Sequence, residues 1–172
     1  INSLLLDNAG IMPGWQVLDI GCGSGDTSLG IARHFGEETS VLGLDVSAPL
    51  LDLARQRCQD QGAANVSFLE ADVQAQIPSR DKFDLAVSRF GVMFFTRPVI
   101  AFGNIHSAMK PGGSVVFVAW STANENPWFQ IPRDAAISVL GKGAPADPRD
   151  PGPTAFSDPG YVEDILRQAG FG

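Results

Sequence analysis

The chain has 172 residues, of which 44% are hydrophobic, and a formal net charge of −7 at pH 7. This length suits one domain, and no stretch approaches the roughly 18 consecutive apolar residues of a membrane-spanning helix. The acidic balance argues against a nucleic-acid partner, because sequence-independent affinity for nucleic acid comes from basic side chains that neutralise phosphates. With two cysteines, no metal-binding motif and no visible signal peptide, we expect a cytoplasmic protein without a disulfide framework or a bound metal.

The first predicted strand, residues 15–20, runs directly into a glycine-rich turn. The sequence VLDIGCGSG at residues 17–25 is followed by apolar spacing that predicts a helix over residues 26–35. Glycines permit positive φ angles and lack the Cβ atoms that would keep a ligand away from the backbone. The pattern therefore predicts a turn against which a ligand can lie, although an ordinary strand-to-helix turn has the same pattern. We interpret Cys22 as a small residue of this turn and not as a nucleophile.

Two carboxylates indicate the kind of ligand. Asp19 precedes the first glycine by two positions, and Asp26 stands where a dinucleotide fingerprint has its third glycine. Both carboxylates would repel a pyrophosphate and would suit a cation. S-adenosylmethionine carries a sulfonium and an amino group and has no phosphate, so the pattern favours it over a nicotinamide or flavin dinucleotide.

The second and third predicted strands, residues 40–45 and 65–70, lead to further acidic residues. Asp45 follows the glycine turn by about twenty residues, the separation expected of an acid that binds a ribose. The alternative is a cap for the helix predicted over residues 48–61, for which Ser47 is the better candidate. Asp72 can accept a hydrogen bond from an adenine amino group, and the backbone amide of Val73 can contact the ring.

The fourth and fifth predicted strands, residues 83–88 and 113–119, flank a helix predicted over residues 98–109, and aromatic segments follow both strands. Open α/β sheets bind ligands at the carboxyl ends of their strands, so we expect these segments to form an apolar pocket for a second molecule. Core packing is the alternative for the apolar side chains, and a surface ion pair is the alternative for the arginine. The candidates are Arg89, Phe90, Met93, Phe94, Trp120 and Trp128, with Asn124 as a further polar group.

Neither histidine is predicted to be catalytic. His34 ends the first helix after the glycine turn, and His106 lies in the helix before the fifth strand, away from the ligand-binding edge. The sequence therefore names no general base. Residues 141–160 contain nine glycines and prolines, which predicts a loop.

Five motifs in order, LDIGCGSG, LGLDVS, LEADVQ, FDLAVSRFGVMFF and MKPGG, resemble the class I S-adenosylmethionine-dependent methyltransferases. The likeness covers residues 15–171 and is to the small-molecule branch similar to the ubiquinone and menaquinone methyltransferases. It implies a doubly wound, Rossmann-like α/β fold with a parallel sheet, and Asp19 and Gly21 at the methionine part of the cofactor. It also implies Ser88 beside the amino acid part. The candidate cofactor-binding residues are Asp19, Gly21, Cys22, Gly23, Gly25, Asp45, Val46, Asp72, Val73 and Ser88.

The five strands are expected in the spatial order third, second, first, fourth, fifth. The family continues into two more strands, so we expect the C-terminal strands to be missing and the outer edge of the fifth strand to have no antiparallel partner from residues 141–172. The chain starts at Ile1 with the pattern of a helix end over residues 1–9. Residues 1–172 are therefore expected to form a single methyltransferase domain that is incomplete at both ends.

Three functions from different classes are compatible with these patterns. The first is methyl transfer from S-adenosylmethionine to a small acceptor that is apolar or aromatic, which all five motifs favour. The second is a partner or regulatory subunit that binds the cofactor without turnover. The third is a nicotinamide oxidoreductase, which Asp26 and the absent third glycine oppose. The acceptor atom and the oligomeric state are not encoded in these patterns.

Overall fold

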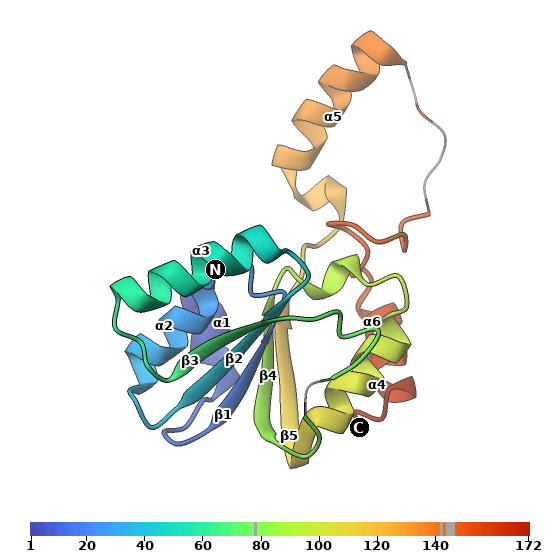
Figure 1. The fold of residues 1–172 in the computed structure, drawn as a ribbon. Coiled ribbons are helices and arrows are strands. Elements are labelled where there is room, and N and C mark those ends of the chain that lie inside the picture. Colours follow the sequence, from blue (N-terminus) through green and yellow to red (C-terminus); the bar gives the residue numbers. More distant parts are fainter. Residues whose placement is uncertain (78, 142, 144–146) are drawn as a thin grey trace.

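The computed structural model describes residues 1–77, 79–141, 143 and 147–172. In these residues a parallel sheet lies between two layers of helices (Figure 1). The strands are β1 (Gln16–Ile20), β2 (Ser40–Asp45), β3 (Val66–Glu70), β4 (Phe83–Arg89) and β5 (Met109–Val118). The helices are α1 (Asn2–Ala9), α2 (Asp26–Phe35), α3 (Ala48–Asp60), α4 (Pro98–Ala108), α5 (Pro127–Leu140) and α6 (Pro159–Gln168), with short 3-10 helices η1 (Val92–Phe94) and η2 (Ala123–Glu125).

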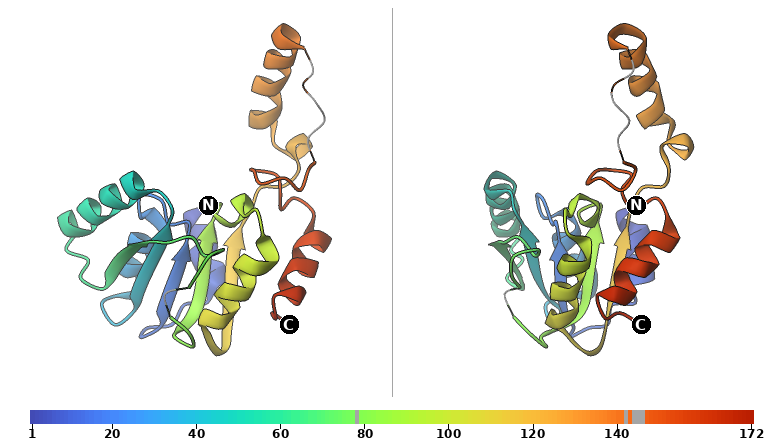
Figure 2. Two further views of the ribbon diagram at one scale, coloured as in Figure 1. Left: turned by 45° about the vertical axis from the view of Figure 1, so that its right-hand side comes forward. Right: turned by 90° about the vertical axis from the view of Figure 1, so that its right-hand side faces the viewer.

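The order of strands in the sheet is β3-β2-β1-β4-β5, and every pair is parallel, as expected from the sequence. This order confirms the doubly wound, Rossmann-like fold. Within the described residues the outer edge of β5 has no strand partner. The end of the chain instead forms α6, which packs beside α4 (Figure 2). The predicted absence of a hairpin along that edge therefore holds for the part of residues 141–172 that the structure describes.

Alternate side chains of each strand point to opposite faces, and the two faces bury different helices. Val17 packs with Leu5 of α1 and with Leu29 of α2 on one face. Leu18 packs with Phe102 of α4 and Ile165 of α6 on the other face. Because Asp19 follows the same alternation as Val17, its carboxylate points toward α2.

The fifth strand begins earlier than predicted, at Met109 and not at residue 113. Its pairing with β4 shifts after the first residue, since Phe83 is opposite Met109 but Leu85 is opposite Ser114. The irregularity falls on a Pro-Gly-Gly sequence, where Gly112 has a φ of 81°. Pro111 and Gly112 lie between the predicted helix and the predicted strand, whereas in the structure they lie at a bulge within β5.

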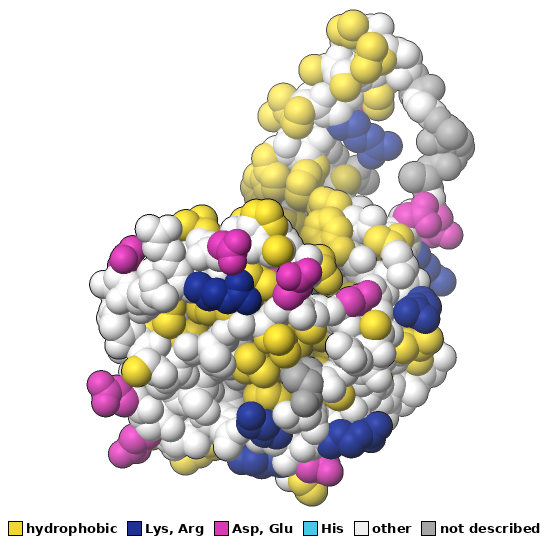
Figure 3. All heavy atoms as spheres, viewed as in Figure 1, with side chains coloured by type: hydrophobic (Ala, Val, Ile, Leu, Met, Phe, Trp, Pro, Cys, Tyr) yellow, Lys and Arg dark blue, Asp and Glu magenta, His cyan; other side chains and the backbone are white. Residues whose placement is uncertain are grey.

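Helix α5 projects from the rest of the molecule, and apolar side chains cover much of its visible surface (Figure 3). Trp128, Ile131, Val139 and Leu140 are exposed. The sequence patterns predict no helix between the fifth strand and residue 141, so α5 was missed. Asn126 precedes this helix, and its Nδ2 donates hydrogen bonds to the carbonyls of Ser121 and Thr122. No helix among the described residues is both long enough and apolar enough to cross a membrane.

Of the loop predicted over residues 141–160, residues 142 and 144–146 lie outside the described part, and the described remainder up to residue 158 is not helical.

Candidate functional site

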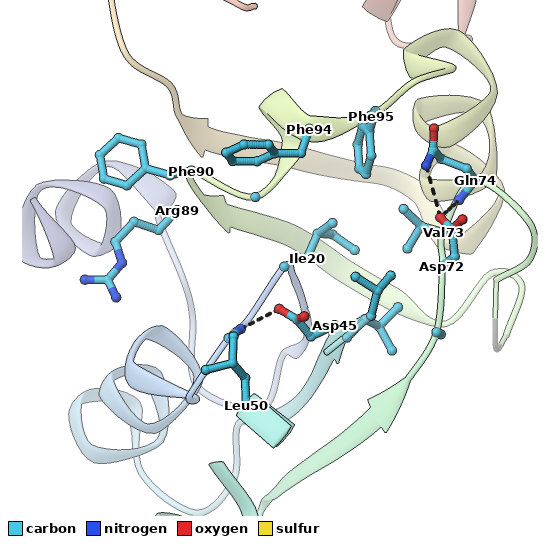
Figure 4. Close-up of a pocket in the computed structure, with 16 residues that line it drawn as sticks. Ile20, Asp45, Leu50, Asp72, Val73, Gln74, Arg89, Phe90, Phe94 and Phe95 are labelled. Atoms are coloured by element: carbon cyan, nitrogen blue, oxygen red, sulfur yellow. Dashed lines mark hydrogen bonds between the residues drawn. The ribbon is translucent and has the colours of Figure 1, made fainter. Parts of the chain in front are cut away.

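A cavity of about 540 Å³ opens at the carboxyl ends of β1, β2, β3 and β4 (Figure 4). Its volume falls within the roughly 300–1,000 Å³ of typical small-molecule sites. Arg89 and Phe90 lie at one end of the cavity, Asp72 and Gln74 lie at the other, and Asp45 lies between them. The lining residues are Ile20, Gly21, Gly23, Leu44, Asp45, Val46, Leu50, Ala71, Asp72, Val73, Gln74, Arg89, Phe90, Gly91, Phe94 and Phe95.

The glycine turn between β1 and α2 forms the floor of this cavity. Gly21, Gly23 and Gly25 have φ angles of 66°, 53° and 80°, which residues other than glycine rarely adopt. A Cβ atom on Gly21 would lie 2.8 Å from Cα of Gly91, so the turn also packs directly on the loop after β4. Apart from its chain neighbours, no atom of the described residues lies within 4 Å of a Cβ built on Gly23, so this residue is open to the cavity.

Asp45 ends β2 and holds the glycine turn in place. Its Oδ2 accepts a hydrogen bond from the Gly23 amide at 2.8 Å, and its Oδ1 accepts one from the Ser47 amide at 2.9 Å. Ser47 occupies the position before α3, as predicted, but its side chain makes no capping hydrogen bond. A carboxylate has about four acceptor positions, so Asp45 can bind two hydroxyl groups in addition to these two amides.

Asp19 lies beneath the turn and is only 1% exposed. The hydroxyl of Ser28 on α2 donates to its Oδ2 at 2.5 Å, while Oδ1 has no partner among the described residues. Desolvation raises the pKa of this carboxyl to about 6, although the hydrogen bond from Ser28 and the charge of Arg89 oppose the rise. An unpartnered buried acceptor of this kind is costly unless a donor or a cation occupies its place.

Asp26 is neutralised by two arginines. Arg89 places its NH1 3.1 Å from one carboxylate oxygen, and Arg57 on α3 places its NH2 3.3 Å from the other. The expectation that Asp26 presents a free negative charge to the ligand is therefore wrong. The surface ion pair that the sequence left open for Arg89 is present, although Arg89 also lines the cavity.

The far end of the cavity is built by the loop after β3. Asp72 accepts a hydrogen bond from the Gln74 amide at 2.9 Å through its Oδ1, and the carbonyl of Val73 accepts one from Asn104 on α4 at 2.7 Å. The side-chain oxygen of Gln74 in turn accepts from the Arg97 amide, which ties this loop to the start of α4. These hydrogen bonds position Asp72 and Val73 at the cavity wall.

The aromatic segments divide between the cavity wall and the core. Phe90 and Phe94 line the cavity, and Phe94 is 54% exposed. Met93 is 1% exposed, lies in the core and accepts the Trp120 amide on its sulfur, so its predicted place in the pocket is wrong. Trp120 and Trp128 are not among the lining residues, but Trp120 stacks on Phe90 with ring centroids 4.4 Å apart. The side chain of Asn124, the further polar candidate, accepts a hydrogen bond from Gln130.

Phe90 has a φ of 66°, an uncommon conformation for a residue with a Cβ. Its amide donates to the Val118 carbonyl at the end of β5, and the stack on Trp120 fixes its ring. Strained backbone at a cavity wall is a feature that functional sites often contain. Here it turns the chain out of β4 and sets Phe90 beside the glycine turn.

Several predicted cofactor residues support the turn without lining the cavity. The hydroxyl of Ser88 is buried, donates to the Ile20 carbonyl at 2.7 Å and accepts the Gly91 amide at 3.2 Å. Cys22 is buried, and desolvation raises the pKa of its thiol far above the ordinary range, which suits a packing residue and not a nucleophile. Gly25 caps α2 and lies against Ala54 and Phe68.

Gln74 and Leu50 line the cavity and were not predicted to do so, whereas Phe95 lines it and belongs to the aromatic segment predicted after the fourth strand. Gln74 directly follows Asp72 and Val73, so its proximity to a candidate adenine site could have been noticed. Leu50 could not be identified as a wall residue because its helical spacing is equally typical of core packing. His34 and His106 are not among the lining residues, and His106 instead contacts Phe171 edge to face.

Comparisons with known proteins identify relatives of this chain. Residues 17–113 match the family model described as "Methyltransferase domain". The 2-phytyl-1,4-naphtoquinone methyltransferase of a Nostoc species is 36% identical over 117 residues, which cover 67% of this chain and 51% of the relative. The chain spans about half the length of the curated relatives it matches.

Solved structures share the fold. A SAM-dependent methyltransferase from Aquifex aeolicus superimposes with a TM-score of 0.73 at 20% identity, over 98% of this chain and 78% of that one. Phosphoethanolamine N-methyltransferase 2 of Haemonchus contortus, solved in complex with S-adenosyl-L-methionine, gives a TM-score of 0.71 at 24% identity, over 98% of this chain and 36% of that one. Since the family model covers more than half of the sequence, the chain belongs to the methyltransferase domain family.

Proposed function

We propose that this chain transfers the methyl group of S-adenosylmethionine to a small acceptor that is apolar or aromatic. The observation that carries the proposal is the cavity in which the glycine turn, Asp45 and Asp72 meet. Membership of the methyltransferase domain family and the name of the Nostoc relative support the same class of reaction.

The residues present suit this cofactor in charge and in order. Asp19 lies beneath the turn and outside the cavity lining, and we assign its unpartnered Oδ1 as the acceptor for the ammonium group of the methionine part. Asp45 retains acceptor positions for the two ribose hydroxyls beyond the two amides that it already binds. Asp72 and Val73, at the far end of the cavity, would contact the adenine.

S-adenosylmethionine supplies an electrophilic methyl group on a sulfonium sulfur. The residues of the chain bind and orient the two reactants, and the rings of Phe90 and Phe94 give the acceptor an apolar surface to contact. Holding an acceptor at near-attack distance can provide much of the acceleration of an in-line displacement. We assign no general base, because neither histidine lines the cavity.

The acceptor side of the cavity is apolar. Phe90 and Phe94 line it, and Trp120 stacks on the ring of Phe90. Aromatic rings of this kind stack favourably on planar ligands. Naphthoquinols and other small aromatic molecules are therefore the first acceptors to test, in agreement with the name of the Nostoc relative.

Titration calorimetry tests the cofactor. S-adenosylmethionine and S-adenosylhomocysteine should bind, and NADH should give no heat of binding; tight binding of NADH alone would overturn the proposal.

The substitution Asp45→Ala should weaken the binding of S-adenosylmethionine by roughly 1.5 to 3 kcal/mol, since hydrogen bonds to a charged acceptor are lost. Asp52→Ala is the matched control, because this exposed residue of α3 pairs only with Arg55 among the described residues. The melting temperature of Asp45→Ala must be measured alongside, since Asp45 also holds Gly23 and Ser47.

A methyl-transfer screen then tests the acceptor. Transfer of labelled methyl to an aromatic acceptor supports the proposal. Binding of S-adenosylmethionine without turnover of any acceptor would instead indicate a cofactor-binding protein that is not an enzyme.

A further inference from the structure

Three charged side chains from three elements meet at the start of α2. Asp26 binds Arg89 through one carboxylate oxygen at 3.1 Å and Arg57 through the other at 3.3 Å. Arg57 is held further by the Ser24 carbonyl, which accepts from its NH1 at 2.9 Å. One carboxylate therefore serves two guanidinium groups, and the three side chains together carry one positive charge.

The excess positive charge lies on the cavity side. Arg89 lines the cavity and its side chain is 32% exposed, whereas Arg57 is absent from the lining residues and contacts the glycine turn from α3. Asp19, buried beneath the same turn, carries a balancing negative charge and has one oxygen without a partner in the described chain. Of these two groups only the guanidinium of Arg89 lines the cavity, so this end of the cavity offers a ligand a cationic group, which matches the carboxylate of an amino acid.

We propose that Arg89 binds the carboxylate of the methionine part of S-adenosylmethionine and thereby selects for the intact amino acid end of the cofactor. The inference rests on the proposed function and reassigns Arg89 from the acceptor pocket. Arg89, Asp45 and Asp72 follow one another along the cavity, in the order that carboxylate, ribose and adenine have in the cofactor (Figure 4). A guanidinium group presents several donors in a planar fork that fits a carboxylate, so Arg89 can keep Asp26 and bind a second carboxylate.

A purely structural ion pair makes a different prediction. If Arg89 served only to hold Asp26, then Asp26→Asn and Arg89→Met would have similar consequences. If Arg89 binds the cofactor, the two substitutions act in opposite directions, because Asp26→Asn leaves the whole guanidinium charge available to the ligand. The direction in which each substitution changes cofactor affinity therefore distinguishes a purely structural ion pair from cofactor binding by Arg89.

The experiment compares S-adenosylmethionine with its decarboxylated form, which keeps the sulfonium and the amino group, by titration calorimetry. The unsubstituted chain should prefer S-adenosylmethionine by about 10- to 100-fold, as expected for a charge-assisted hydrogen bond. Arg89→Met should lose this preference and keep its affinity for the decarboxylated ligand. Asp26→Asn should keep or increase the preference. Arg55→Met removes one positive charge from α3 at a residue that does not line the cavity, and should retain the preference.

Three results would overturn the inference: equal binding of both ligands by the unsubstituted chain, equal weakening of both by Arg89→Met, or loss of the preference in Asp26→Asn. In each case S-adenosylmethionine can still bind the unsubstituted chain, so the proposed function stands. Failure of that chain to bind either ligand would overturn the proposed function itself. Melting temperatures of the variants identify any loss of affinity that comes from unfolding.

Discussion

Asp19→Asn should remove a pH-dependent cost to the stability of the fold. The Asp19 carboxyl is buried, has one hydrogen bond from Ser28 and leaves Oδ1 without a partner among the described residues. Desolvation raises its pKa from the ordinary 3.8 to about 6. The folded state therefore holds the proton more tightly than the unfolded chain does. As the pH rises from 3.8 to about 6, the unfolded chain releases this proton first, and the free energy of unfolding falls.

The magnitude follows from the size of the pKa change. A rise from 3.8 to about 6, at about 1.4 kcal/mol per pKa unit, corresponds to about 3 kcal/mol. This cost is absent below pH 3.8 and is complete above about pH 6. The neutral Asn keeps the hydrogen bond from Ser28 but buries an amide without an acceptor, which costs about 1 to 3 kcal/mol at every pH. The pH dependence of the difference between the two proteins is therefore the decisive quantity.

Urea unfolding of both proteins from about pH 4 to pH 8 measures that difference. The stability of Asp19→Asn relative to the unsubstituted chain should increase by about 2 to 3 kcal/mol between pH 4 and pH 7. A difference that stays constant over this range would refute the reasoning.

Asp84 is a control of opposite sign: burial acts to raise its pKa, but hydrogen bonds from the Gln16 amide and Lys110 prevail and lower it. Asp84→Asn should therefore lose stability at neutral pH, and this loss should disappear in acid as the native carboxyl becomes protonated.

Asp19→Asn should also weaken the binding of the cofactor. If the ammonium group of S-adenosylmethionine lies near Oδ1, binding favours the ionised carboxylate and releases a proton near pH 6. The affinity of the unsubstituted chain should then increase as the pH rises through this range, and the affinity of Asp19→Asn should not. Calorimetry in two buffers with different heats of ionisation counts the released protons. A cofactor affinity independent of pH in the unsubstituted chain would contradict this role.

Four further substitutions have defined consequences. Gly21→Ala should destabilise the fold by about 2 kcal/mol or more in urea unfolding, since it strains a φ of 66° and places a Cβ 2.8 Å from Gly91. Ser88→Ala should cost about 1 to 3 kcal/mol by leaving buried backbone groups unpaired, without a direct contact to the cofactor. Phe94→Ala should lower turnover with little change in melting temperature, whereas Met93→Ala should cost about 2 to 5 kcal/mol through a core cavity. Unchanged turnover in Phe94→Ala would exclude that ring from the acceptor site.

The sheet could be predicted because its strands are short apolar runs with clear boundaries. The predicted residues 40–45 coincide with β2, and the others differ by a residue or two except at β5. The early start of β5 depends on how Met109 pairs with Phe83 across a bulge, and local sequence does not specify that pairing. Helix α5 escaped prediction because prolines occupy both its first position and position 132, where they usually indicate a break.

The site was predicted less completely than the sheet, because side-chain direction and long-range pairing decide it. Met93 and Phe94 are adjacent and both apolar, yet the 3-10 helix turns the first into the core and the second toward the cavity. Arg57 reaches Asp26 only because α3 packs beside the start of α2, and the two residues are 31 positions apart. Neither outcome has a signal in a local sequence pattern.

The pairing of Asp26 changes which residue can distinguish the cofactor from a dinucleotide. With two guanidinium groups on its carboxylate, Asp26 cannot repel a pyrophosphate as a free charge would, and Asp45 would suit the ribose of either ligand. Of Asp19 and Asp26, only Asp19 has no ion pair with an arginine among the described residues, and its unpartnered oxygen favours a cation. Selectivity for S-adenosylmethionine over NADH should therefore fall in Asp19→Asn and persist in Asp26→Asn. The opposite result in calorimetry would assign this selectivity to Asp26. The ligand would then have to break the ion pairs of Asp26 with Arg57 and Arg89.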